Sequence, residues 1–206
     1  MTDTLNTTDD LIALDPEARR LLFTDARTAN SFTDEPVTEA HLRAVYELTK
    51  FPPTAANTQP LRILYVDRGA SRERLVEHML GNNKAKTLAA PAVAVLAYDS
   101  RFHEFIPTVF PIRPEMKDVF DGDADRREGH ARFNATLQAG YYLLGVRAAG
   151  LAAGPMAGFD AAGVDGEFFP DGRWKTLLVV NIGHPGEDAW FDRLPRLDYD
   201  EVVRHV

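Results

Sequence analysis

The sequence of 206 residues contains no cysteine. This absence excludes disulfides, thiolate metal sites, Fe–S clusters and a cysteine nucleophile, and it fits a reducing compartment. Serine is scarce as well, since only Ser31, Ser71 and Ser100 occur and none stands in the G-x-S-x-G pattern of a serine hydrolase. The six histidines show neither H-E-x-x-H nor another ligand spacing, so we expect no metal site.

The familiar nucleotide motifs are missing too. Neither G-x-G-x-x-G after a strand nor G-x-x-x-x-G-K-[ST] occurs, which removes the Rossmann fingerprint and the P-loop. Basic charge is in deficit, because 23 Lys and Arg stand against 31 Asp and Glu and give a net charge of −8. No polybasic run offsets this balance. We therefore expect neither nucleic acid nor an anionic membrane as a partner.

Long apolar runs are also lacking. The longest one, residues 88–98, is too short to span a bilayer. The first twenty residues are acidic and lack the positive and apolar regions of a signal peptide. These features predict a cytoplasmic protein.

What remains is an ordinary globular composition, with 45% hydrophobic and 26% charged residues. Without repeats or linkers, it predicts one α+β domain over residues 1–206, with a C-terminal arm from about 184 to 206. One helix is expected from Asp15 to Phe23, a second starts near Thr38, and a third follows a cap at Ser71. Two more are expected over 130–149 and from Asp160 to Phe168. Strands are expected at 62–67, 92–98 and 174–182, the second buried on both faces.

The longest expected helix, 130–149, ends at Gly150 and carries one apolar stripe, made of Phe133, Leu137, Tyr141, Leu144 and Ala148. Before it, residues 99–129 predict an irregular excursion with one or two short helices. Its phenylalanines, from Phe102 to Phe120, form either a wall over a bound ligand or part of a subunit interface.

Four segments carry candidate chemistry. Residues 26–32 join an arginine to small hydroxyl residues, which suits a phosphate but also a surface turn. Residues 51–60 form a proline-stiffened loop that presents amide side chains. Such amides suit the edge of a planar heterocycle, although a plain turn explains the loop equally. Residues 153–159 allow a flat ligand to approach the backbone, although a helix cap followed by a turn explains them equally. Residues 193–197 are basic, as a solvated tail is.

The order and spacing of these segments resemble the FMN-dependent nitroreductase family. The motifs are Arg-Thr-Ala-Asn-x-Phe from Arg27, Pro-Thr-Ala-Ala-Asn-Thr-Gln-Pro from Pro53, Gly-Pro-Met-Ala-Gly-Phe from Gly154, Asn-Ile-Gly-His-Pro from Asn181 and Pro-Arg-Leu from Pro195. More narrowly, the segments 86–91 and 154–160 resemble the malonic semialdehyde reductase branch, the 3-hydroxypropionate dehydrogenases. The likeness covers most of the chain from about Pro16.

The resemblance implies a three-layer α+β fold with a mostly antiparallel central sheet, in an intertwined homodimer with two FMN sites at the subunit interface. Arg27, Thr28 and Ala29 would bind the ribityl phosphate, with Arg196 as a second cation. Thr54, Ala55 and Asn57 would line the isoalloxazine ring, Asn57 as its amide contact. The remaining expected residues back the ring near N5, namely Pro155, Met156, Ala157 and Gly158.

Three positions depart from the family pattern. Asn30 stands where many members carry Lys or Arg near the flavin N1–C2 carbonyl. Ala55 replaces a frequent Ser, and Leu61 replaces an aromatic residue after Gln-Pro.

The resemblance also implies the reaction. NAD(P)H would pass a hydride to flavin N5 and leave, and an acceptor would then take it up in ping-pong turnover, with malonic semialdehyde reduced to 3-hydroxypropionate. The cofactor carries this chemistry, so no protein side chain is assigned a catalytic role. Three alternatives stay open: a nitroaromatic or quinone reductase, a non-catalytic flavin-binding protein and a scaffold without cofactor.

Overall fold

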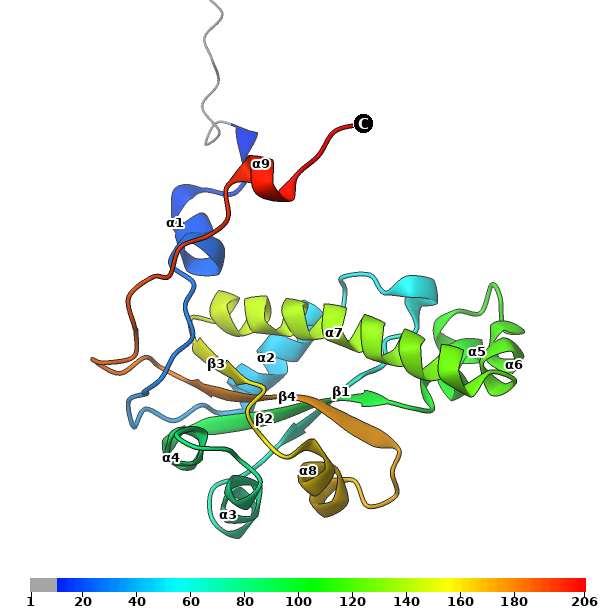
Figure 1. Cartoon of the computed structure of the whole chain (residues 1–206), viewed down its shortest axis with the longest axis horizontal. Coiled ribbons are helices and arrows are strands. Elements are labelled where there is room, and N and C mark those ends of the chain that lie inside the picture. The colour runs from blue at the N-terminus through cyan, green and yellow to red at the C-terminus, as the bar shows by residue number, and fades with distance from the viewer. Residues whose placement is uncertain (1–10) are drawn as a thin grey trace, which may run out of the picture.

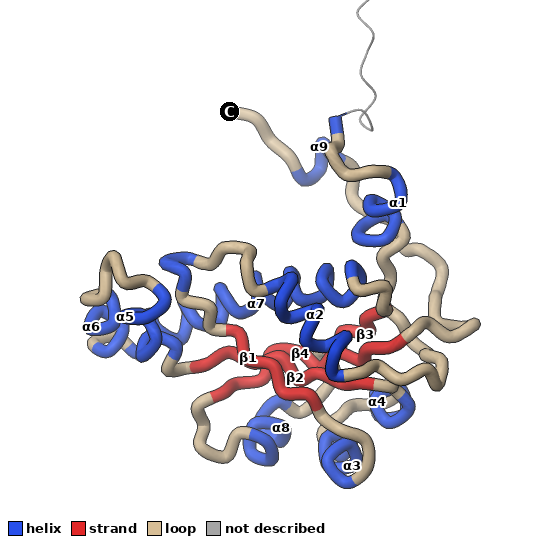
Figure 2. The backbone as a smooth tube through the Cα atoms, turned by 180° about the vertical axis from the view of Figure 1, so that it is seen from behind, coloured by secondary structure: helices blue, strands red, loops and turns tan. Residues whose placement is uncertain are grey.

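The computed structural model describes residues 11–206 and places them in three layers around a four-stranded antiparallel sheet, in the order β1-β2-β4-β3 (Figure 1). Helices α2 and α7 cover one face of the sheet, while α3, α4 and α8 cover the other (Figures 1 and 2). The expected α+β fold with an antiparallel sheet is confirmed. Residues 1–10 lie outside the described residues. The domain expected over 1–206 and the N-terminal segment that lacks a signal-peptide pattern are therefore described only in part.

The strands are β1 (Leu61–Tyr65), β2 (Ala92–Asp99), β3 (Ala152–Met156) and β4 (Trp174–Gly183). The α-helices are α1 (Pro16–Arg19), α2 (Glu39–Thr49), α3 (Ala70–Glu77), α4 (Asn83–Ala89), α5 (Ile106–Val109), α6 (Met116–Asp121), α7 (Ala124–Ala148), α8 (Ala161–Phe168) and α9 (Tyr199–Val202). Three shorter elements are the π-helical turn η2 (Arg20–Thr24) and the 3₁₀ turns η3 (Ala55–Asn57) and η4 (Phe102–Phe105).

The central strand β2 is buried along its whole length, as its continuous apolar sequence predicts. It pairs with β1 on one side and β4 on the other. Alternate side chains enter two different cores, since Leu96 packs beneath α7 and Val95 packs against α3 and α8. Helices on both faces explain why an antiparallel strand carries no polar residue before its last position.

Helix starts follow local capping chemistry. The side chain of Asp15 accepts a hydrogen bond from the backbone of Ala18, and Asp160 does the same for Gly163, so both expected caps are confirmed. The expected cap at Ser71 is wrong. Helix α3 begins at Ala70 after Gly69, whose φ of 91° is accessible to a residue without a Cβ.

Helix α7 begins six residues earlier than expected. The Asp123 side chain caps it by accepting from the backbone of Arg126, so the charged run at 124–128 forms its first turns and leaves the excursion. Its large apolar stripe also faces outward: Phe133 is 70% exposed and Leu137 is 39% exposed. Smaller and polar residues face the sheet instead, among them Ala131, Asn134, Ala135, Gln138, Ala139 and Tyr142.

Strand β3 was expected as a turn. Gly154 and Pro155 have low strand propensity, but β3 is the edge strand, where a proline without an N–H is tolerated. The excursion contains η4, α5 and α6, and its aromatic residues build a small core of their own. Phe102 and Phe120 are both buried there, with ring centroids 5.1 Å apart.

The two terminal segments leave the body at the same end (Figures 1 and 2). Arg193 donates to the carbonyl of Thr24, which joins the C-terminal arm to the first helical segment. Arg147 near the end of α7 donates to Leu21 O at 2.8 Å. No helix among residues 11–206 is long and apolar enough to cross a membrane.

Candidate functional site

The segment around Arg27 is fastened along the edge of the sheet. Ala29 N donates to Ala153 O at 3.0 Å, and Asn30 N donates to Ala189 O at 2.9 Å. Gly154 makes this close approach possible, because a Cβ at that position would lie 2.5 Å from Ala29 O. The chain therefore presents Arg27 and Thr28 from a fixed backbone beside β3.

Two adjoining hollows, of about 330 and 390 Å³, open at this edge. They share Ala26, Arg27, Thr28 and Arg196 as lining residues. The first hollow adds Asn30, Phe191 and Arg193, and the second adds Leu143, Leu144, Arg147, Ala153 and Pro155. In a chain of net charge −8, four arginines line the two hollows against the single carboxylate of Asp192, which suits a phosphate ester, and the apolar lining suits a ring system.

Burial lowers the pKa of Arg147 from its ordinary value, a shift that nearby Asp25 opposes and nearby Arg193 adds to. An arginine remains protonated at neutral pH despite such a shift. Arg147 therefore contributes a partly desolvated positive charge, which interacts more strongly with an anion than a fully hydrated one does.

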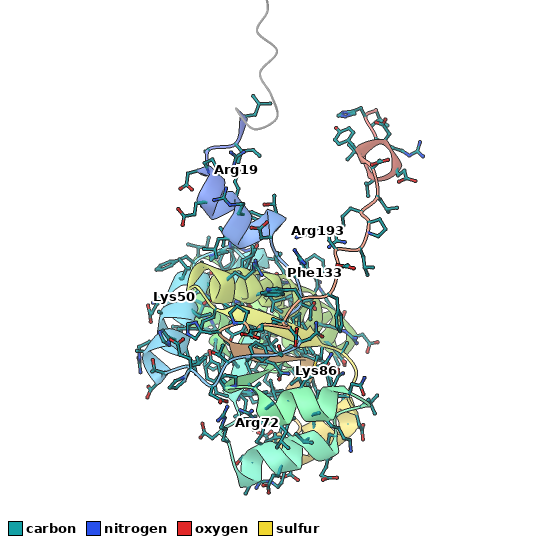
Figure 3. All side chains as sticks on the ribbon, turned by 90° about the vertical axis from the view of Figure 1, so that its left-hand side faces the viewer. Arg19, Lys50, Arg72, Lys86, Phe133 and Arg193 are labelled. Carbon is teal, nitrogen blue, oxygen red and sulfur yellow. The ribbon has the colours of Figure 1, made fainter. Side chains whose placement is uncertain are left out.

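Lys86, to which the sequence assigned no role, contacts two lining residues of the first hollow. Its Nζ donates to Asn30 Oδ1 at 2.7 Å and lies 5.9 Å from the ring centroid of Phe191. A positive charge thus stands beside Asn30, where the sequence alone showed a neutral residue. Figure 3 labels Lys86 on α4 and Arg193 on the C-terminal arm.

Asn83, one turn before Lys86 on α4, borders the expected ring-backing segment. Its Nδ2 donates to Gly158 O at 3.1 Å, and a Cβ at Gly158 would lie 2.7 Å from that same nitrogen. Met156 is buried and Ala157 is exposed. The Asn-x-x-Lys spacing, which places both side chains on one helix face, is the signal that could have identified the pair.

The second expected part of the site, residues 54–59, is a loop with unusual backbone angles. Ala56, Asn57 and Gln59 have φ values of 51°, 51° and 44°, in the left-handed region. Such a conformation costs roughly 1–2 kcal/mol for a residue with a Cβ. The loop therefore needs contacts that hold it.

Asn57 has partners on both sides of its amide. Its Nδ2 donates to Val109 O at 2.7 Å, and its Oδ1 accepts from Gln59 Nε2 at 3.0 Å. One N–H and one lone pair of this exposed amide are left for another contact. The bond to Val109 also ties the loop to α5 of the excursion.

Polar side chains of α7 support the loop from behind. Asn134 Oδ1 accepts from Ala55 N at 2.8 Å, and His130 Nε2 lies 3.0 Å from Thr58 Oγ1. One turn further, Gln138 Oε1 accepts from Leu61 N at 3.0 Å at the start of β1. Sequence reasoning missed these three residues, although their spacing of four defines one helix face.

The two parts of the expected site do not meet within one chain. Arg27, Thr28, Pro155 and Arg196 line the hollows near the end of α7, with Ala29 directly behind them. The loop with Thr54, Ala55 and Asn57 lies at Asn134, and none of these three lines either hollow. Gly140, the α7 residue of the second hollow that is nearest to Asn134 in the sequence, is about 9 Å from it along the helix axis.

The fold and this cationic edge define a class: an α+β protein with a hollow suited to a phosphate-bearing, partly apolar small molecule. The model of the family described as "Nitroreductase family" matches residues 24–184. The chain belongs to this family.

Among relatives, a Streptomyces coelicolor protein with the name "Putative NADH dehydrogenase/NAD(P)H nitroreductase" is 56% identical over 187 residues, which cover 91% of this chain and 93% of that protein. A protein of the same name from Caulobacter sp. strain K31 is 44% identical over 94% of this chain and 98% of that protein.

Solved structures share the fold. A protein of Exiguobacterium sibiricum, solved in complex with FMN, superposes with a TM-score of 0.80 at 16% identity and covers 94% of this chain and 98% of its own. An enone reductase of gut-bacterial fatty acid saturation superposes with a TM-score of 0.78 at 16% identity, and the match covers 93% of this chain and 99% of the reductase.

Proposed function

We propose that this chain is an FMN-dependent NAD(P)H oxidoreductase that reduces malonic semialdehyde to 3-hydroxypropionate. The observation that carries the cofactor assignment is the arginine-lined hollow at the edge of β3. Gly154 has no Cβ, so the backbone at Ala29 can pack against the strand and position Arg27 and Thr28. The FMN complex of the Exiguobacterium protein and the NAD(P)H in the relatives' names support it.

Each expected residue has a role in this proposal. Arg27 and Thr28, with the backbone of Ala29, bind the phosphate, and Arg196 adds a second guanidinium. The segment 155–158 backs the ring, and Lys86 supplies the positive charge that Asn30 lacks. When bound, FMN supplies the hydride-transfer chemistry. The chain itself holds the reactants in position and keeps the ring desolvated.

The cofactor site is completed by a second copy of the chain in this proposal. The loop at 54–57 lines neither hollow of its own chain, so it would line the ring bound to a partner. The outward apolar stripe of α7, with Phe133 and Leu137, offers a surface for such a dimer. The two observations support one homodimer with two shared sites.

The substrate assignment rests on the resemblance of segments 86–91 and 154–160 to the malonic semialdehyde reductase branch. The relatives' names favour a nitroaromatic acceptor as the second candidate. Steady-state kcat/KM for malonic semialdehyde, a nitroaromatic and a quinone, measured with NADH and with NADPH, separates the two. A higher kcat/KM for the nitroaromatic than for the aldehyde would contradict the branch and retain the family.

Asn57 is expected to contact the ring with its remaining amide hydrogen. The Asn57→Leu variant should therefore change the flavin absorbance spectrum and its reduction potential, with the far-UV circular dichroism unchanged. Gln59→Leu is the matched control, because it removes the hydrogen bond that Gln59 Nε2 donates to Asn57 Oδ1 and keeps the Asn57 side chain itself. A wild-type potential in Asn57→Leu would assign Asn57 to the turn alone.

Phe105 is expected to touch the acceptor. It is 45% exposed, the guanidinium carbons of Arg62 and Arg173 lie 5.4 and 5.7 Å from its ring centroid, and it lines a hollow together with Gln59. Phe105→Ala should raise the KM of the acceptor about two- to tenfold, as the loss of one aromatic contact does. Ile112→Ala, at another exposed position of the excursion, should leave KM unchanged. Equal KM values in both variants would contradict the contact.

A further inference from the structure

The loop at 54–59 does not adopt its shape by local preference. Three of its residues with a Cβ, namely Ala56, Asn57 and Gln59, have left-handed backbone angles. Its internal hydrogen bonds, such as Gln59 N to Thr54 Oγ1 at 3.1 Å, close the turn but do not fix where the turn lies on the protein. The placement comes from contacts outside the loop, which are the bond from Asn57 to Val109 O of α5 and the contacts with α7 behind the loop.

Asn134 of α7 makes that contact. The residue is 1% exposed, its Oδ1 accepts from Ala55 N at 2.8 Å, and its Nδ2 donates to His130 O at 3.0 Å. Both ends of the amide are therefore engaged, and its orientation is fixed. A side chain held in this way transmits the position of α7 directly to the backbone of Ala55.

His130 adds a second support one turn away. Its ring stacks on Phe102 at 5.2 Å and lies 4.7 Å from Phe120, so it connects the excursion core to Thr58. Burial lowers the pKa of His130, and the charge of Arg126 adds to this effect, whereas a backbone hydrogen bond to Ala55 opposes it. The ring is neutral at neutral pH, and its contact with Thr58 joins two neutral groups.

We propose that Asn134 is a positioning residue that sets the height and tilt of the 54–57 loop against the flavin ring, with His130 as its second support. The inference rests on the proposed function, in which this loop lines the isoalloxazine. Since α7 also borders the second hollow through Leu143 and Arg147, each α7 helix holds the hollow of one shared site and the loop of the other. Asn134 acts through the N–H of Ala55 and touches no reacting atom.

Gln138 provides a matched control. It is one turn from Asn134 on the same face and accepts one backbone N–H in the same way, but that N–H belongs to Leu61 at the start of β1. Asn134→Leu and Gln138→Leu each leave a backbone N–H without its acceptor. Both variants should therefore lower the melting temperature of the protein. Only Asn134→Leu should shift the flavin reduction potential and raise the dissociation constant of FMN about tenfold.

Asn134→Asp separates positioning from stability. The carboxylate still accepts from Ala55 N but faces His130 O without a hydrogen to donate, so the melting temperature falls while the dissociation constant of FMN stays much closer to wild type than in Asn134→Leu. FMN titration, spectroelectrochemistry and thermal melts of the four proteins are the test. If the two leucine variants shift the potential equally, or if neither shifts it, the positioning role is wrong. A wild-type protein that takes up no FMN would overturn the proposed function and this inference together.

Discussion

Arg27→Ala is expected to weaken FMN binding by about 1.5–3 kcal/mol, the value of a hydrogen bond to a charged group. This corresponds to roughly a ten- to 150-fold higher dissociation constant. Arg27 lies on a backbone that Gly154 and Ala29 hold against the sheet, so its guanidinium is presented to the hollow at small conformational cost. The measurement is a fluorescence titration of the apoprotein with FMN.

Arg74→Ala is the matched control for this variant. Arg74 on α3 is exposed and pairs with Glu167 on α8, both in the layer opposite α7, so its loss should leave FMN affinity unchanged. Wild-type affinity in Arg27→Ala would reject the phosphate assignment. Equal weakening in both variants would indicate a general effect of net charge.

The Phe133→Asp/Leu137→Asp double variant is expected to dissociate the proposed dimer and thereby release FMN. Each of these outward side chains contributes roughly 1.5–3 kcal/mol when it is buried in an interface, and each occurs on both subunits. The dissociation constant of the dimer should therefore rise by at least about a thousandfold. Light scattering coupled to size exclusion should show a monomer without bound flavin.

Leu80→Asp serves as the control for the interface. Leu80 is 58% exposed beyond the end of α3, on the layer opposite α7, and should tolerate a charge without a change of mass or flavin content. A double variant that remains dimeric would place the interface elsewhere. A monomer that still binds FMN with wild-type affinity would contradict the shared site.

Local chemistry made much of the fold predictable. The Asp15 and Asp160 caps and the apolar run of β2 each depend on a few neighbouring residues, so the sequence shows them directly. Strand β3 was missed because its pairing with β4, and not its own propensity, makes Gly154 and Pro155 extended. The same limit applies to α7, since periodicity finds an apolar stripe but does not tell whether it packs on the sheet or on another molecule.

The candidate site was likewise predictable from the sequence only in part. The segment around Arg27 and the loop at Asn57 were expected because their motifs are local. Lys86 and Asn134 were missed because their roles depend on contacts across 56 and 79 positions of the chain, to Asn30 and Ala55. No pattern within a short window reports such contacts.

The central claim, that this chain is an FMN-dependent NAD(P)H oxidoreductase, is tested most directly by the visible absorbance spectrum of protein purified without added flavin. Anaerobic NADPH is added next, followed by malonic semialdehyde. We expect a yellow protein that bleaches with NADPH and regains its colour with the aldehyde. A colourless protein that also fails to take up added FMN would contradict the claim.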